Sequence, residues 1–151
     1  EMYGREYGLK SAILRYANVY GPRQDPDGEA GVVAIFFDQI RRGEPITIFG
    51  DGKQTRDYVY VSDVVAANLL AMQKAISTPV NVGTGIQTSV LKLTELMKKI
   101  SGKRIKVKHR AAVTAEVRKS ALDVKLAKRV LGWKPTVTLL DGLRQTWEDQ
   151  A

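Results

Sequence analysis

Short blocks of apolar and polar residues alternate along the chain, and their spacing predicts helices and strands in turn. Apolar residues three or four positions apart, the spacing of one helix face, fall within residues 32–40, 64–71, 90–100, 126–131 and 140–147. Apolar runs of strand length cover residues 11–16, 46–49, 79–82 and 105–108. Residues 46–49 and 56–61 are interpreted as two short strands around a turn at Asp51-Gly52. Because helices and strands alternate, we expect an α/β fold.

The residues at the element ends support these assignments. Ser62, Ser89 and Asp123 precede helical segments, and short polar side chains of this kind cap helix starts. Glycine, which adopts the left-handed backbone of a helix end, follows four helical segments, at Gly8, Gly43, Gly102 and Gly132. Residues 17–30 contain several Pro and Gly and predict a long loop. We interpret residues 1–7 as the last turns of a helix that began upstream, and therefore expect the chain to be part of a longer protein.

Composition narrows the classes of protein. A length of 151 residues with 44% hydrophobic residues fits one compact unit. The absence of Cys and the single His109 exclude disulfides and a thiolate or histidine-cluster metal site. With neither a spanning segment nor a leader in the sequence, we expect a cytoplasmic protein that does not bind membranes.

The net charge of +8 favours anionic partners, such as nucleotide diphosphates or nucleic acid. Much of the excess lies in residues 98–110 and 119–129, where basic residues share elements with regularly spaced apolar ones. This pattern is typical of solvated basic faces. Charge by itself does not decide between the two kinds of anionic partner.

Five segments carry motifs whose order along the chain is informative. They are RYANVYGPR at 15–23, GVVAIF at 31–36, IFGDGKQTRDYVYVSDV at 48–64, NVGTGIQTSV at 81–90 and LGWKP at 131–135. Together they resemble the extended short-chain dehydrogenase/reductase family, in particular UDP-glucose 4-epimerases and their dehydratase relatives. The resemblance implies the carboxy-terminal, substrate-binding part of such an enzyme, a small mixed sheet with helices. Residues 1–30 would then end the NAD-binding Rossmann domain, and residues 31–151 would form the nucleotide-sugar-binding domain.

The chemistry that the resemblance implies is reversible hydride transfer between the sugar C4 and NAD, in a homodimeric parent enzyme that binds a UDP-sugar. In the family a Tyr-x-x-x-Lys motif supplies the catalytic base. None of the six tyrosines of this chain has Lys four residues on. The motif is expected upstream of Glu1, so we place no catalytic residue in this chain and expect the fragment to be inactive alone.

Arg56 is the candidate ligand of the substrate diphosphate. Its planar guanidinium can hold two phosphate oxygens at once, and Gln54, Asp57 and Tyr58 are neighbours able to orient it. Tyr58 is included among the substrate-binding residues. The alternative is that Arg56 only forms a salt bridge, with Asp57 or Asp63. If the guanidinium points away from any groove, or is locked into an internal ion pair, the assignment to phosphate binding fails.

Asn18 follows a predicted strand, at the end where parallel strands place their binding loops. The resemblance implies that Asn18 binds the diphosphate and that Tyr16 and Asn18 lie near the nicotinamide. The alternative for Asn18 is a turn-stabilising side chain. Val32 and Val33 begin a helix whose exposed amides would meet the sugar nucleotide, although valines at such positions are more often core.

The remaining site residues are assigned by resemblance. The backbone of Thr47, Ile48 and Phe49 is expected to contact the uracil, although these residues also fit a buried strand. Glu116 corresponds to the acid that binds the ribose hydroxyls. The family usually has Arg-x-Gly-Glu before the last helices, whereas this chain has Val113 in place of the arginine. Either Arg110 or Arg118 substitutes, or a charged hydrogen bond of ~1.5–3 kcal/mol is lost.

Two glycine pairs imitate a dinucleotide-binding fingerprint. Gly28-x-x-Gly31 follows a Pro/Asp loop instead of a strand, which removes the context that gives the motif its meaning. Gly83-Thr84-Gly85 does lie between a strand and a helix, but Thr88 stands at the third glycine position. We interpret it as a loop of the substrate domain.

Two alternative functions stay open. A dTDP-glucose 4,6-dehydratase or a UDP-glucuronate decarboxylase would share these motifs. A basic nucleic-acid-binding module would explain the charge, but such modules interleave aromatic residues with basic ones. Here Tyr58 and Tyr60 lie among acids, and Trp133 and Trp147 are placed for packing, so nucleic-acid binding is disfavoured.

Overall fold

The computed structural model describes residues 2–27, 31–74, 76 and 78–149, and it has an α/β fold. The helices of this part of the chain lie close to the segments predicted from apolar spacing. They are α1 (Met2–Tyr7), α2 (Val32–Arg41), α3 (Val61–Gln73), α4 (Val90–Ser101), α5 (Lys125–Leu131) and α6 (Leu139–Asp149).

The strands form separate two-stranded ladders. Three ladders are parallel, namely β1 (Leu14–Tyr16) with β6 (Val80–Val82), β2 (Asn18–Tyr20) with β5 (Tyr58–Tyr60), and β3 (Ile46–Phe49) with β8 (Val107–Arg110). The fourth is antiparallel and joins β4 (Thr55–Arg56) to β7 (Thr88–Ser89). The hairpin expected around Asp51-Gly52 is wrong, because β3 pairs with β8 and not with β4 or β5.

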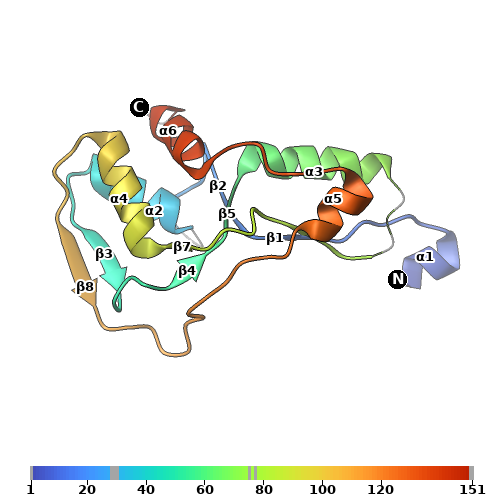
Figure 1. Ribbon diagram of the computed structural model, residues 1–151, viewed down its shortest axis with the longest axis horizontal. Coiled ribbons are helices and arrows are strands. Elements are labelled where there is room, and N and C mark those ends of the chain that lie inside the picture. Colours follow the sequence, from blue (N-terminus) through green and yellow to red (C-terminus); the bar gives the residue numbers. More distant parts are fainter. Residues whose placement is uncertain (1, 28–30, 75, 77, 150–151) are drawn as a thin grey trace.

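The elements form two groups along the long axis of the molecule (Figure 1). At one end α2 and α4 lie near the β3–β8 ladder and α6 packs on α4 and β5, and at the other end α3 and α5 accompany β1 and β6. Each group has its own apolar core. The first core includes Phe37, Ile40, Ile46, Ile48, Leu93, Met97 and Leu143. The second core includes Val59, Ala67, Val80, Val82, Leu131 and Trp133, with Leu14 and Val19 packed against it.

The second core contains residues from both sides of the predicted domain boundary at residue 30. Leu14 and Val19, which precede that boundary, pack with Val59 and Val80, which follow it. The division into residues 1–30 and 31–151 stays a prediction. In the structure the ladders β1–β6 and β2–β5 join the two segments.

Most helix ends agree with the sequence. Ser89 caps α4, since its Oγ accepts a hydrogen bond from the Lys92 amide, and Gly102 and Gly132 end α4 and α5 in the left-handed conformation. The expected cap at Ser62 is wrong. Helix α3 begins at Val61, two residues before the start that a Ser62 cap would give, and among the described residues no side chain caps it.

Asp63 in the first turn of α3 has a structural role instead. Its buried carboxylate accepts hydrogen bonds from the amides of Thr136 and Val137 and from the Thr136 hydroxyl, while its carbonyl accepts from Trp133 Nε1 at 2.9 Å. A buried carboxylate needs such partners, because leaving it unpaired is costly. Asp63 therefore fixes the connection between α5 and α6 against α3.

Asp57 likewise holds the glycine-containing loop at residues 83–85 in place through its buried carboxylate. Its carboxylate is 2% exposed and accepts hydrogen bonds from the amides of Thr84, Gly85 and Leu122 and from the Thr84 hydroxyl. A Cβ on Gly83 would come within 2.6 Å of Asp57 Oδ2, so only glycine fits there. The amides of Thr84 and Gly85, which imitate a phosphate-binding loop in the sequence, thus donate to Asp57 and not to a ligand.

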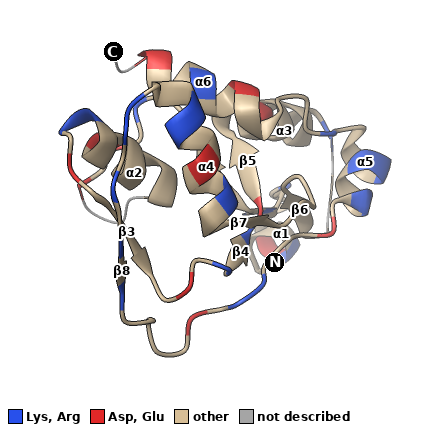
Figure 2. Cartoon of the chain, turned by 60° about the vertical axis from the view of Figure 1, so that its left-hand side comes forward, with Lys and Arg blue, Asp and Glu red and all other residues tan. Residues whose placement is uncertain are grey.

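The basic residues of the carboxy-terminal half are spread over the surface (Figure 2). On α5 the cations Lys125, Lys128 and Arg129 are exposed, while Ala127 and Leu131 face the core. The solvated basic face predicted for this segment is therefore confirmed. Within the described residues no helix is long and apolar enough to cross a membrane.

Candidate functional site

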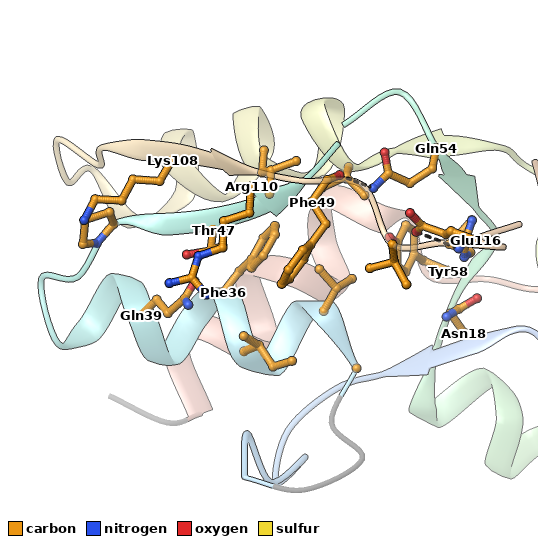
Figure 3. Close-up of a pocket in the computed structure, with 18 of the residues that line it drawn as sticks. Asn18, Phe36, Gln39, Thr47, Phe49, Gln54, Tyr58, Lys108, Arg110 and Glu116 are labelled. Carbon is orange, nitrogen blue, oxygen red and sulfur yellow. Dashed lines mark hydrogen bonds and ion pairs between the residues drawn. The ribbon is translucent and has the colours of Figure 1, made fainter. Parts of the chain in front are cut away.

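A cavity of about 780 Å³ lies between α2, the β3–β8 ladder and residues 113–116, a size within the usual range of ligand pockets (Figure 3). It brings together most of the predicted substrate-binding residues, although they come from distant parts of the sequence. Those that line it are Asn18, Val32, Thr47, Ile48, Phe49, Arg56, Tyr58 and Glu116.

Two predicted residues do not line this cavity. Val33 is 1% exposed and packs in the first core, as the alternative interpretation of this valine had it. Tyr16 lines a different cavity between β1 and α3, where its hydroxyl donates to Asn68 Oδ1 at 2.9 Å. The predicted contacts of Val33 and Tyr16 involve their backbone, so these side-chain positions leave those predictions open.

Arg56 lies on β4 at the wall of the cavity, and three hydrogen bonds orient its guanidinium. Nη1 donates to the carbonyls of Thr55 and Val117, at 2.9 and 2.6 Å, and Nη2 donates to Glu116 Oε1 at 3.1 Å. A guanidinium has five N–H donors. No described residue accepts from Nε, so part of the donor fork remains available to a ligand.

The ion pair between Arg56 and Glu116 departs from the sequence analysis. Asp57 and Asp63 were the expected partners in the alternative interpretation, and both carboxylates bond elsewhere. The partner is Glu116, and the side chains of Arg56 and Glu116 are 21% and 23% exposed. An internal ion pair would exclude phosphate binding at Arg56, but both side chains of this pair are partly exposed. Its position in the cavity wall counts in favour, because a ligand can reach the pair.

The loop that carries Glu116 lacks the cation expected at residue 113. Val113 lines the cavity and is 54% exposed. Arg118, one proposed substitute, pairs with Asp51 at 3.0 Å instead, and its hydrogen bonds hold the pKa of that carboxyl at about 2. Arg110, the other, lines the cavity but reaches toward Gln39, away from Glu116 (Figure 3). Among the described lining residues, Arg56 is therefore the cation at the Glu116 end.

Ala115 precedes Glu116 in an unusual backbone conformation. Its φ is +62°, a left-handed value that a residue with a Cβ adopts only at a cost. The family motif has glycine at this position. The loop thus keeps the backbone shape that glycine would favour, although alanine occupies it.

Strand β3 presents one free edge to the cavity. The amides of Ile46 and Gly50 donate to the carbonyls of Lys106, just before β8, and Arg110, the last residue of β8, and in a parallel ladder alternate residues face the same neighbour. The backbone groups of Thr47 and Phe49 therefore face the opposite edge. There Gln54 Nε2 donates to the Phe49 carbonyl at 3.0 Å, which leaves the Thr47 carbonyl and the Phe49 amide directed to the open side.

Tyr58 and Asn18 are register partners on β5 and β2, at the Glu116 end. The Tyr58 hydroxyl is buried without a hydrogen-bond partner in the described structure, and burial raises the pKa of Tyr58 to about 12. The side chain of Asn18 forms no hydrogen bond with a described residue, which does not support the turn-stabilising alternative. Both side chains line the cavity with polar atoms to spare.

The first turn of α2 also borders the cavity. Gly31 precedes this helix, and no side chain within the described residues caps it. The first amides of a helix lack intrahelical partners and carry its positive dipole end. Gly31 and Val32 line the cavity, so these amides lie where an anion can reach them.

The sequence analysis missed Phe36, Gln39 and Lys108 as lining residues and gave Gln54 and Arg110 other roles. Phe36 contributes an aromatic side chain from α2, Gln54 fixes the Phe49 carbonyl, and Gln39, Lys108 and Arg110 form the end far from Glu116. The helical spacing of α2 carried a weak signal for Phe36 and Gln39, which lie three residues apart on one face. No local sequence pattern predicted that Lys108 and Arg110 lie at this end of the cavity, because their position depends on the pairing of β8 with β3.

The parallel strand pairs belong to an α/β fold, and its cavity joins a cation, a helix start without a described cap and an open strand edge, a combination suited to an anionic ligand. The model of the NAD dependent epimerase/dehydratase family matches residues 1–83, more than half of the chain. The chain therefore belongs to this family of NAD-dependent enzymes.

Individual relatives agree with this assignment. The UDP-glucose 4-epimerase of Mycolicibacterium smegmatis is 44% identical over 148 residues, which are 97% of this chain and 47% of that protein. UDP-glucuronic acid decarboxylase 3 of Arabidopsis thaliana is 35% identical over 97% of this chain and 43% of that protein. The crystal structure of UDP-glucose 4-epimerase with UDP-glucose from Thermotoga maritima has a TM-score of 0.94 and 54% identity, covering 99% of this chain and 48% of that one. The chain thus spans about half the length of the curated relatives it matches.

Proposed function

We propose that this chain is the substrate-binding part of an NAD-dependent UDP-sugar 4-epimerase that interconverts UDP-glucose and UDP-galactose. The observation that carries the proposal is the position of Arg56 in the wall of a nucleotide-sized cavity. Two carbonyls orient its guanidinium, and Nε has no acceptor among the described residues. The similarity to UDP-glucose 4-epimerases over nearly the whole chain supports the same substrate.

The diphosphate would bind at the Glu116 end of the cavity. Arg56 supplies a charge-assisted donor fork, and the first amides of α2 supply further donors of partial positive charge. Asn18 adds an amide from the opposite wall. Because Val113 adds no charge, we expect Arg56 to account for most of the phosphate affinity.

The ribose and the base would lie along the cavity toward β3. Glu116 lies next to the phosphate-binding arginine, where its carboxylate can accept hydrogen bonds from ribose hydroxyls. The base would lie against Phe36 and Phe49, with its edge bonded to the Thr47 carbonyl and the Phe49 amide. These backbone groups supply one acceptor and one donor, as the edge of a pyrimidine requires.

The ion pair between Arg56 and Glu116 is compatible with this arrangement if the ligand competes for it. Without ligand, Glu116 neutralises a guanidinium that would otherwise be partly buried without a counter-charge. A phosphate bound at Arg56 replaces that counter-charge. Glu116 is then released to accept from the ribose.

NAD is the cofactor of the family, and when bound it takes up and returns a hydride at the sugar. The described residues do not supply its phosphate-binding loop, because Asp57 occupies the amides of Thr84 and Gly85. We propose contacts to NAD only at Tyr16 and Asn18. No tyrosine of this chain has Lys four positions on, so we expect the chain alone to be inactive. A homodimeric parent protein and a cytoplasmic location stay predictions.

A dTDP-glucose 4,6-dehydratase and a UDP-glucuronate decarboxylase are the alternatives, and the similarity to a UDP-glucuronic acid decarboxylase supports the second. All three reactions would use the same cavity for the nucleotide diphosphate. They differ in the chemistry at the sugar and not in the binding of the nucleotide diphosphate.

Calorimetric titration of the chain with UDP, UDP-glucose, dTDP and a short single-stranded oligonucleotide tests the proposal. We expect UDP to bind, and Arg56→Ala to weaken it by ~10-fold or more, as for the loss of a charged hydrogen bond. Arg118→Ala is the matched control, because it removes an ion-paired arginine outside the cavity and should leave UDP binding unchanged. Unaltered UDP binding in Arg56→Ala, or tight and salt-sensitive oligonucleotide binding without nucleotide preference, would refute the proposal.

A further inference from the structure

The end of the cavity far from Glu116 is polar, and the proposed function leaves it unexplained. Gln39 on α2 and Lys108 and Arg110 on β8 line it. The register of the ladder pairs Thr47 with Lys108 and Phe49 with Arg110. Register partners in a parallel ladder carry their side chains on the same face of the sheet. Both cations therefore share the face on which Thr47 and Phe49 border the cavity.

Arg110 and Lys108 differ in the direction of their side chains. Arg110 extends across Thr47 toward Gln39 on the opposite wall, whereas Lys108 points outward along the ladder (Figure 3). The order along the cavity is thus Glu116, then Phe49, then Thr47, and finally Arg110 with Gln39. Arg56 lies at the Glu116 end, because its Nη2 donates to Glu116 Oε1. A base bonded to the backbone of Thr47 and Phe49 would lie between the two arginines.

The groups at this end have unused hydrogen-bonding capacity. Arg110 is exposed to the cavity and has no carboxylate partner among the described residues, although Glu44 also lines this end. Gln39 Oε1 is buried without a hydrogen-bond partner in the same part of the structure. The guanidinium donates at all five N–H groups and accepts at none. A ligand group that meets it must therefore be an acceptor.

We propose that Arg110 is a specificity-determining residue that donates to a carbonyl oxygen of the pyrimidine base and selects uracil over cytosine. This inference rests on the proposed function, since it requires the diphosphate at Arg56 and the base at β3. Uracil carries a carbonyl at the ring position where cytosine carries an amino group. An amino group there would place donor against donor, and a site built around a hydrogen bond rejects the analogue that cannot form it.

The test compares UDP with CDP in calorimetric titrations of the chain at one fixed salt concentration. We expect CDP to bind ~10-fold or more weakly than UDP. Arg110→Leu should weaken UDP by a similar factor and leave CDP nearly unchanged, so that the ratio of the two Kd values falls toward one. Arg110→Lys, which keeps the charge but loses the planar fork, should also lose most of the preference.

Lys108→Leu is the matched control, because it removes the same charge from the same strand and the same face. It should weaken UDP and CDP in parallel and keep their ratio. An Arg110→Leu variant with the wild-type ratio overturns the role of Arg110 and leaves the proposed function standing. By contrast, failure of Arg56→Ala to weaken either nucleotide overturns the proposed function, and the role of Arg110 with it.

Discussion

Nη2 of Arg56 donates to Oε1 of Glu116 at 3.1 Å, and the two residues are 60 positions apart in the sequence. The contact joins β4 to the loop before α5 and places both groups in the cavity wall. A cation and an anion that the proposed function assigns to different parts of the ligand are therefore paired to each other in the free protein. Ligand binding must exchange this contact for others.

Glu116→Gln tests the exchange directly. The substitution keeps the shape of the side chain but removes the charge that competes with phosphate, so inorganic pyrophosphate should bind about two- to five-fold tighter, the range of a partly exposed ion pair. Isothermal titration measures this Kd. Glu95→Gln, which removes an exposed carboxylate from α4, serves as control and should have no effect. Equal or weaker pyrophosphate binding in Glu116→Gln would show that the pair does not oppose phosphate.

Val113→Arg should restore the second cation that the family motif carries. The side chain borders the cavity at the Glu116 end, so a guanidinium there can reach the same phosphates as Arg56. We expect UDP to bind ~10-fold tighter, at the lower end of the contribution of a charged hydrogen bond. Val117→Arg is the control, since Val117 is exposed and does not line the cavity. An equal gain in both variants would mean that net charge alone is responsible.

Ala115→Gly should stabilise the fold. The left-handed backbone at Ala115 costs ~1–2 kcal/mol for a residue with a Cβ, and the greater freedom of glycine in the unfolded chain offsets part of the gain. A net increase of ~0.5–1 kcal/mol in the free energy of unfolding should appear in urea denaturation followed by circular dichroism. Ala111→Gly, in the same loop without a positive φ, should instead destabilise slightly. A lower free energy of unfolding for Ala115→Gly than for the wild type would show that the backbone at Ala115 is not strained.

Tyr58 should make the fold sensitive to alkaline pH. Its pKa is about 12 because the hydroxyl is buried, compared with ~10 for an unfolded tyrosine. Above pH ~10 the unfolded chain loses a proton that the folded chain keeps, so stability is full below pH ~10 and falls as the pH rises toward 12. This difference in pKa between the folded and the unfolded chain corresponds to ~3 kcal/mol.

Tyr58→Phe removes this titration and keeps the ring. At pH 7 the loss should be small, because the hydroxyl has no hydrogen-bond partner among the described residues. Urea denaturation at pH 7 to 11.5 should show a shallower decline for the variant than for the wild type. Burial also raises the pKa of Tyr20, so some decline should persist. Identical slopes in the two proteins would disprove the role of Tyr58.

Local pattern was sufficient for much of the secondary structure. The helices follow from apolar spacing, and Ser89, Gly102 and Gly132 act at helix ends as expected, because capping and left-handed turns depend on neighbouring residues alone. The motifs around Asn18 and Arg56 also identified part of the cavity lining. Local rules also failed in places. Ser62 satisfies the rule for a cap, yet α3 begins at Val61, after Tyr60.

The sequence by itself determined the fold class, the family and the residues that carry charge and polar groups to the cavity. Only the tertiary structure decided that β3 pairs with β8, that Glu116 is the partner of Arg56, and that Arg110 faces Gln39. The physical reason is range. Helix spacing and glycine conformation are set within a few residues, whereas a parallel strand pair or a carboxylate 60 positions away is selected by the packing of the whole chain.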